Sequence, residues 1–428
     1  MAILGALSIA RSGLVATGEA LSVTGNNIAN VNTTAFKGSR PEFADLLEVE
    51  TGGGNGLGVR LADSSTSFVQ GAIENTSRPT DLAIEGRGFF VVKEGEGFVY
   101  TRAGNFVLNS DAQLVTGQGH MVQGYALDAL NNPIGPEVDI DFGNIATEVS
   151  STSRITLQNN LSANADDSIG PFDGTQGWNE AYATSNYTST VRVYDSLGNQ
   201  HELTLFFTKT GANAWEVNVG ADAGKLEPAG TAGELSLVGS PISLTFDSEG
   251  ALTAPGATDI NVTFQGAAAQ DISLDFGTPT AAPGDGLGRD GIVQLGGVSS
   301  VAGTQDGFGA GLLRSVSVQE NGIVVGHFDN GQSRPIYQLA LADFAAPDRL
   351  SSLGNGLFRE SVGSGIATIV TPDSAGLGRV IEQSIERSNV DLATEFVNLI
   401  SLQRAFQANA RVITTSDGLL NDLLNIVR

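Results

Sequence analysis

The amino-acid sequence predicts a mixed α and β protein with a nested, multidomain chain. Its N- and C-terminal helices are expected to pair in a coiled-coil-like manner, with two all-β domains between them. Both ends carry apolar residues at alternating three- and four-residue spacings, which is the stripe of an amphipathic helix. Between the ends, short runs of β-branched and aromatic residues alternate with Gly, Asn and Asp turns, which is typical of all-β domains.

The first helix follows from a heptad stripe near the N-terminus. Asn, Thr and Gly become frequent between residues 27 and 38 and compete with helical hydrogen bonding, so the helix is expected to end there. The stripe consists of Ile3, Leu7, Ala10, Leu14, Thr17, Leu21, Thr24, Ile28 and Val31.

The middle of the chain is predicted to contain two β domains, one inserted into the other. A hairpin around Asp195-Ser196-Leu197-Gly198-Asn199 belongs to the inserted domain. Residues 39–78 and 362–384 are expected to be extended or irregular. The predicted divisions are a terminal helical assembly domain (1–31 plus 385–428), an extended linker region (32–78 plus 362–384), a β-rich domain (79–149 plus 304–361) and an inserted outer β domain (150–303).

The last helix is predicted from a second heptad stripe that almost reaches the C-terminus. Its start signal is Ser388-Asn389-Val390-Asp391, an N-cap candidate with an acidic residue suited to the positive end of a helix. Two matched stripes at opposite ends of a chain are expected to pack side by side. The apolar positions are Leu392, Phe396, Leu399, Phe406, Ala410, Ile413, Leu420, Leu424 and Val427, with Gln403 and Asp417 in the two remaining slots.

Charge and composition exclude several classes of function. The net charge of −25 argues against nucleic-acid binding, because a phosphate backbone would be repelled. The two terminal segments together are neutral, so residues 41–379 carry this whole charge. The chain has no Cys, which excludes disulfides and thiolate metal sites. No stretch approaches the ~18 apolar residues of a membrane span, and the N-terminus lacks the basic region of a signal peptide.

No catalytic, metal or cofactor site is predicted. The three histidines, His120, His201 and His327, do not have a metal-binding spacing. Gly286-Leu287-Gly288-Arg289-Asp290-Gly291 matches a dinucleotide-binding pattern, but it lacks the preceding strand and following helix that such a site needs. These observations favour a structural protein over an enzyme.

Three motifs resemble those of the bacterial flagellar axial proteins, the family of rod and hook subunits. The segments Asn27–Lys37 and Ser388–Ala410 resemble the family's N- and C-terminal signatures, and Gly86–Val92 with Tyr100–Phe106 is similar to its shared β domain. The signature residues are Asn27, Ala29, Asn30, Asn32, Thr33, Phe36, Lys37, Ser388, Asn389, Val390, Asp391, Gln403 and Arg404.

The insertion at 150–303 makes the chain resemble the hook branch of this family. The resemblance implies a subunit that polymerises into a flexible, curved helical tube, a universal joint that transmits motor torque from rod to filament. It implies export by the flagellar type III apparatus without signal cleavage and an extracellular place in the hook, attached to the basal body. Implied partners are copies of the chain, rod proteins, the hook cap and hook–filament junction proteins. Implied assembly residues are Ile3, Leu7, Leu14, Leu21, Ile28, Leu392, Phe396, Leu399, Phe406, Ile413, Leu420, Leu424 and Val427.

Two alternatives remain open at the level of sequence. A distal rod subunit would share both ends of the chain, but that hypothesis leaves the insertion unexplained. A secreted β-rich enzyme or carbohydrate-binding protein would need a cleft lined by acidic and aromatic residues. Trp178 and Trp215, both in the insertion, are the candidates for such a sugar site.

Overall fold

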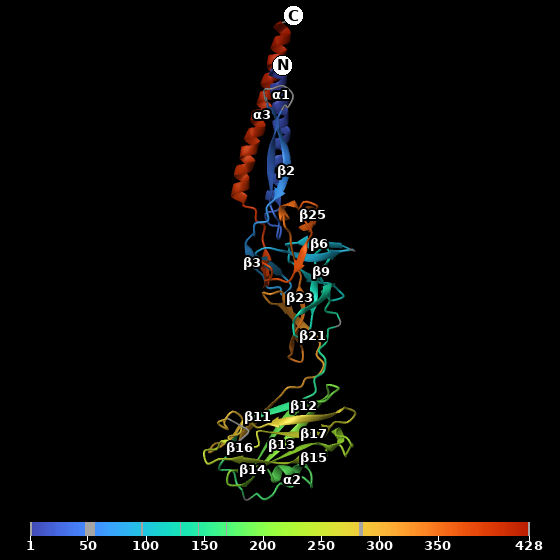
Figure 1. Cartoon of the computed structure of the whole chain (residues 1–428), viewed down its shortest axis with the longest axis vertical. Coiled ribbons are helices and arrows are strands. Elements are labelled where there is room, and N and C mark those ends of the chain that lie inside the picture. The colour runs from blue at the N-terminus through green and yellow to red at the C-terminus, as the bar shows by residue number, and fades with distance from the viewer. Residues whose placement is uncertain are drawn as a thin grey trace. The chain divides into compact units, whose positions relative to one another are not determined.

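The chain divides into two compact units. The computed structural model describes residues 2–47, 56–95, 97–128, 130–143, 145–167, 169–281 and 286–426. Unit 1 comprises residues 1–145, 313–327 and 333–428, and unit 2 comprises residues 146–312 and 328–332. The predicted β-rich class with helices at both ends is confirmed (Figure 1). The exact domain boundaries stay a prediction.

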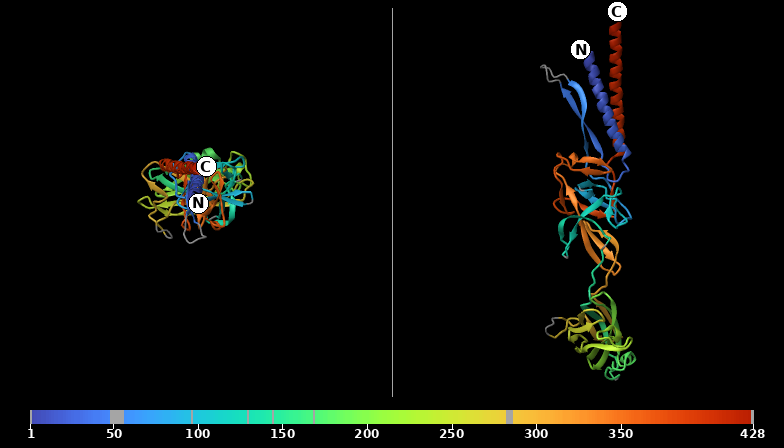
Figure 2. Two further views of the ribbon diagram at one scale, coloured as in Figure 1. Left: turned by 90° about the horizontal axis from the view of Figure 1, so that it is seen from above. Right: turned by 90° about the vertical axis from the view of Figure 1, so that its right-hand side faces the viewer.

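Two long helices in unit 1 begin and end close to where the sequence predicts. Helix α1 (Ala2–Ala29) stops where the Asn30 side chain donates back to the Asn26 carbonyl at 3.0 Å. Helix α3 (Leu392–Ile426) starts behind Asp391, whose Oδ1 accepts the backbone N–H of Thr394 at 2.7 Å, as expected of an N-cap. The two helices contact each other, and both chain ends lie at the same end of unit 1 (Figures 1 and 2).

The segment after α1 differs from the expectation of an extended or irregular linker. It forms an antiparallel hairpin of β1 (Ser39–Leu47) and β2 (Gly56–Thr66), which packs on α1. Gly58 has φ +112°, and a Cβ there would lie 2.0 Å from Ser12 Oγ, so only glycine allows this approach. The hairpin is largely solvent-exposed, so its strands lack the apolar alternation by which half-buried strands are predicted.

The body of unit 1 is a 13-stranded sheet made from both halves of the chain. Its main path runs β21-β22-β23-β9-β5-β6-β26-β25. Outside the sheet, β28 pairs with β4 and β29 with β3, so part of the second predicted linker is also β structure. The strands are β3 (Ile73–Asn75), β4 (Leu82–Glu85), β5 (Phe89–Glu94), β6 (Gly97–Thr101), β7 (Val107–Leu108), β8 (Leu114–Val115), β9 (Met121–Leu127), β10 (Pro133–Asp139), β21 (Leu313–Val318), β22 (Ile323–Phe328), β23 (Ser333–Leu339), β24 (Leu341–Asp343), β25 (Ser351–Gly354), β26 (Leu357–Arg359), β27 (Thr368–Val370), β28 (Arg379–Glu382) and β29 (Ser384–Glu386), with a 3-10 turn at Pro347–Arg349.

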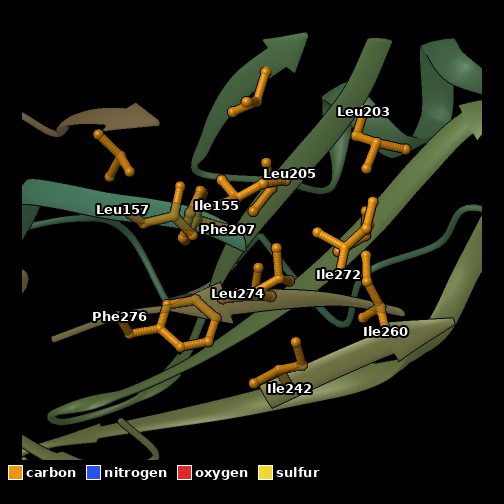
Figure 3. Close-up of a cluster of buried hydrophobic side chains, with 14 of the residues drawn as sticks. Ile155, Leu157, Leu203, Leu205, Phe207, Ile242, Ile260, Ile272, Leu274 and Phe276 are labelled. Carbon is orange, nitrogen blue, oxygen red and sulfur yellow. The ribbon is translucent and has the colours of Figure 1, made fainter. Parts of the chain in front are cut away.

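Unit 2 consists of two five-stranded sheets that enclose a separate core. One contains β17-β18-β11-β19, with β20 also paired to β11, and the other runs β12-β13-β14-β15-β16. Figure 3 shows side chains of both sheets meeting, for example Leu157 and Leu274 of one with Phe207 of the other. The elements are β11 (Arg154–Ser162), α2 (Trp178–Ala183), β12 (Tyr187–Tyr194), β13 (Gln200–Gly211), β14 (Ala214–Asp222), β15 (Leu235–Phe246), β16 (Leu252–Ala254), β17 (Ala257–Thr263), β18 (Ala269–Asp275), β19 (Ile292–Leu295) and β20 (Ser300–Gln305), with a 3-10 turn at Ala223–Lys225.

The hairpin predicted at Asp195 is confirmed, and it joins β12 to β13. Asp195 Oδ1 accepts the backbone N–H groups of Leu197 (2.8 Å) and Asn199 (2.9 Å), while Oδ2 accepts from His201 Nε2 at 2.8 Å. Asp247 repeats the first part of this motif with the N–H groups of Glu249 and Ala251. A short Asp or Asn side chain can thus fix a turn by accepting the backbone N–H groups of residues close to it in the sequence, which is why such turns are predictable.

Replacing Asp195 by asparagine is expected to lower the free energy of unfolding of unit 2 by about 1–3 kcal/mol, because an amide NH₂ would face the Asn199 and His201 donors in a buried place. Asp247→Asn is the control, since that turn uses a single oxygen. Urea unfolding followed by tryptophan fluorescence measures the effect, because both tryptophans lie in unit 2. Equal losses in the two variants would contradict the prediction.

The same carboxylate makes this stability depend on pH. Burial alone would raise the pKa of Asp195, but hydrogen bonds from His201, Asn199 and Leu197 outweigh it and hold the pKa below its ordinary value. The resulting stabilisation is therefore complete above the unfolded-state pKa of about 3.9 and is lost as the pH falls further, through the folded-state pKa. The difference between wild type and Asp195→Asn is expected to shrink in that acidic range.

Candidate functional site

The face that α1 turns inward differs from the predicted stripe. Ala10, Thr17 and Thr24 of the stripe are buried, but Leu7, Leu14, Leu21 and Ile28 are only half-buried. The buried positions between them are the small or polar residues Gly13, Ala16, Ala20 and Asn27. A Cβ on Gly13 would lie 2.7 Å from Asn409 Nδ2 of α3, so small residues allow this close contact and leave the larger ones beside it.

On α3, three of the six predicted apolar positions whose side chains are described remain exposed, and none of the six is buried. Phe396 retains 50% of its accessible surface, and Leu392 (41%) and Phe406 (40%) are also exposed, whereas Leu399 and Ile413 are half-buried. Leu419, which widens the predicted stripe, is exposed too, and so are three apolar residues that were not predicted, Val397, Ile400 and Val412. The side chains of Ile3, Leu420, Leu424 and Val427 lie outside the described residues. Within this part of the chain, the helix pair presents an apolar surface that its own unit does not cover.

A second open surface lies between α1 and the β1–β2 hairpin. It is a groove of about 490 Å³ whose apolar lining includes Leu7, Val15, Leu46, Val59 and Leu61. Val15 keeps 55% of its surface exposed. The hairpin therefore covers α1 only in part.

The two predicted signature motifs meet where the helices join the β structure. Asn27 at the end of α1 forms two hydrogen bonds with the backbone of Ser39, and its Nδ2 donates to Glu395 Oε1 of α3 at 3.1 Å. Asn389 mirrors it: Oδ1 accepts the Gly38 N–H at 2.9 Å, while Nδ2 donates to two carbonyls of the chain that follows β2. Two asparagines thus connect segments that lie more than 350 residues apart in the sequence.

The remaining signature residues have varied surroundings. Asn32 Oδ1 lies 3.4 Å from Arg387, and the Asn30 side chain accepts the Thr33 hydroxyl at 3.0 Å. Gln403 and Arg404 are not at this junction but on the exposed surface of α3. Ala29 and Thr33 are exposed, while Phe36, Ser388 and Val390 are half-buried.

A buried ionic group, called here the junction cluster, consists of Lys37, Arg102 and Glu386. The Lys37 and Glu386 side chains are fully buried, and Nζ lies 2.6 Å from Oε1. Arg102 Nε lies 3.3 Å from Oε2 without hydrogen-bond geometry, and its guanidinium donates to the carbonyls of Gly88 (2.6 Å) and Gly86 (2.8 Å). The cluster joins the N-terminal motif, the β domain and the segment that leads into α3.

The junction cluster contains two cations and one carboxylate. Burial lowers the pKa of Lys37, which Glu386 partly opposes and Arg102 reinforces. Burial likewise lowers the pKa of Arg102, against the attraction of Glu386. Lys37 belongs to the predicted N-terminal signature and Arg102 lies within the Tyr100–Phe106 motif, but neither Arg102 nor Glu386 was predicted as a site residue. No local signal marked Glu386, because the short strand β29 that places its side chain in the core was not predicted.

The alternative of a sugar-binding site is weakened by where the tryptophans lie. Trp215 is fully buried in the core of unit 2, while Trp178 of α2 packs near Phe206 with a centroid distance of 6.1 Å. Within the described ranges, no group of three or more His, Cys, Asp or Glu side chains could hold a metal ion. Among the helices so described, none is both long and apolar enough to span a membrane.

Four family models match successive parts of the chain. Residues 7–37 match "Flagella basal body rod protein" and residues 83–162 match "Flagellar hook protein FlgE/F/G D1 domain". Residues 160–308 match "Flagellar basal body protein FlaE D2 domain", and residues 381–426 match "Flagellar basal body rod FlgEFG protein C-terminal". The matches thus cover both signature motifs and the insertion.

Similar proteins align over almost the whole chain. The flagellar hook protein FlgE of Salmonella typhimurium is 34% identical over 426 residues, covering 98% of this chain and 99% of the relative. That of Escherichia coli K12 is 33% identical over 430 residues, covering 98% and 100%. A crystal structure of Helicobacter pylori flagellar hook protein FlgE2 aligns at 15% identity and covers 73% of this chain and 100% of that one. Its TM-score of 0.45 is too low to carry a conclusion.

Proposed function

The chain belongs to the flagellar hook protein family, and on that premise we propose that it is a structural subunit that polymerises into the hook through α1 and α3. The polymer is a flexible, curved helical tube that transmits torque from the rod to the filament. The proposed role is mechanical.

The observation that carries this proposal is the uncovered apolar surface of the two helices. Phe396 and Ile400 of α3 remain about half exposed, and Leu7, Leu14 and Leu21 of α1 are only half-buried. Contiguous exposed apolar surface on a folded subunit favours association. In the tube, neighbouring copies would complete the coiled-coil-like packing that one subunit begins with its small-residue face.

Unit 2 is proposed to be the outer, inserted domain of the subunit. Residues 160–308 match a D2 domain model, and this part of the chain is what the hypothesis of a distal rod subunit left unexplained. In support, the core of unit 2 is built wholly from its own strands.

The proposed partners follow from the family. They are other copies of the chain, the rod proteins below the hook, the hook cap, the junction proteins toward the filament, and the flagellar type III export apparatus. The proposed location is the extracellular hook.

Electron microscopy of the purified, concentrated protein tests this function. Tubes of uniform diameter, curved along their length, are the expected result. Dispersed particles at every concentration and in precipitating salt would contradict it.

A further inference from the structure

The junction cluster joins three segments of one subunit, and polymerisation does not require these contacts. Three segments converge on one carboxylate: residues 35–38 after α1, the β domain through Arg102, and residues 384–389 before α3. Glu386 Oε1 accepts from Lys37 Nζ and also from the backbone N–H of Gly71 at 2.8 Å. The main chain follows the same path, because Ala35 donates to the Glu386 carbonyl at 2.7 Å. All these contacts lie within unit 1.

The cluster contains two cations and one carboxylate, so losing the charge of Glu386 has a different consequence from losing the charge of Lys37. Removing the Lys37 charge leaves Arg102 paired with Glu386. Removing the Glu386 charge leaves two cations facing each other without solvent, since the side chains of Lys37 and Arg102 are 0% and 4% exposed. Removing one partner of a buried ion pair is far more damaging than removing an exposed pair.

We propose that Glu386 is a lock that fixes the segments adjoining α1 and α3 onto the β domain in the isolated subunit, before any neighbour is bound. Its carboxylate compensates two buried cations at once, so the lock opens when this one charge is lost. Among the described residues, helices α1 and α3 make their main contacts with each other and with the hairpin, whereas the segments between the helices and the β domain fold together with that domain.

Trypsin can report directly on the lock, because Arg387 lies beside Glu386. Its backbone N–H donates to the Ala72 carbonyl at 2.8 Å, so cleavage after Arg387 requires the segment to detach. The experiment uses dispersed full-length subunits and measures the rate of this cleavage by mass spectrometry. In wild type we expect cuts after Arg404 and Arg411 in α3 and protection after Arg387.

Glu386→Gln is expected to accelerate cleavage after Arg387 by about a hundredfold or more, since a buried charge pair is broken without change of shape. Lys37→Met is expected to have a smaller effect. The double variant Lys37→Met/Glu386→Gln is expected to be cleaved more slowly than Glu386→Gln alone, because it removes one of the two uncompensated cations. Glu85→Gln is the matched control, since it breaks the exposed pair with Arg379 on the adjoining strands β4 and β28.

Two results would overturn the proposal. One is a cleavage rate in Glu386→Gln equal to that of Glu85→Gln. The other is a double variant cleaved faster than Glu386→Gln, as expected if the residues act only through packing. Should Glu386→Gln fail to fold, a folded double variant supports the lock and an unfolded one refutes it. Because the subunits are dispersed, these outcomes are independent of whether the protein forms tubes.

Discussion

Replacing Phe396 and Ile400 of α3 together by aspartate is expected to abolish tube formation while the subunit stays folded. Both side chains are about half exposed, so replacing them lowers the free energy of unfolding of the isolated subunit less than replacing core side chains would. In a polymer, burying the exposed half of each side chain contributes about half of the 1.5–3 kcal/mol of a fully buried one, so about 1.5–3 kcal/mol for the two together. Losing both corresponds to a rise of at least about tenfold in the concentration needed for polymerisation, and two charges placed in an apolar contact raise it further.

The measurement is sedimentation of polymer across a range of protein concentrations, with electron microscopy of the pellets. Circular dichroism and tryptophan fluorescence establish that the variant is folded. Ser401→Asp serves as control, because it adds a charge to an exposed polar position of the same helix. Tubes formed by the double variant at the wild-type concentration would show that this surface of α3 lies outside the assembly contacts.

Replacing residues 151–307, the main part of unit 2, by a tight turn is expected to leave tubes that are straight or altered in curvature. The two residues that flank the replaced segment already form a hydrogen-bonded backbone pair. Ser150 donates to the Phe308 carbonyl at 3.0 Å, and Phe308 donates to the Ser150 carbonyl at 2.8 Å. An Asn-Gly dipeptide in place of residues 151–307 would close this pair as a two-residue hairpin. The cores of unit 1 remain complete without the replaced residues.

The expected change in curvature rests on the proposal that unit 2 is the outer domain. Subunits on the inner and outer sides of a bend must differ in spacing, and modest polar contacts between outer domains can accommodate that difference. Electron micrographs of the variant tubes measure it. Absence of tubes would place the insertion in the assembly core, while unchanged curvature would place the origin of the bend in unit 1. Either outcome would refute the prediction.

The sequence by itself determined the features that depend on neighbours in the chain. The heptad stripes predicted α1 and α3 almost to their ends, because helical periodicity is a local property. Asp195 predicted its hairpin because its own carboxylate accepts the turn's N–H groups. The signature motifs indicated the family for the same reason: their residues are contiguous in the chain.

The tertiary structure decided which surfaces of these elements are buried. The predicted α1 stripe contained the large leucines but not Gly13 or Ala20, because periodicity does not distinguish a face that meets its own chain from one left open. Close approach of α3 selects Gly13 and Ala20 for the inner face and leaves Leu14 and Leu21 half-buried. The β1–β2 hairpin was missed because largely exposed strands carry little apolar alternation.

The junction cluster shows why such features are decided only in the folded chain. Lys37 and Glu386 are separated by 349 residues, and nothing local to either one indicates the other. Their pairing depends on the path of the chain between them, which also supplies Arg102 from the β domain and the Gly71 N–H from the segment before β3. A buried charge is stable only where such partners converge, and that convergence is a property of long-range packing rather than of any short stretch of sequence.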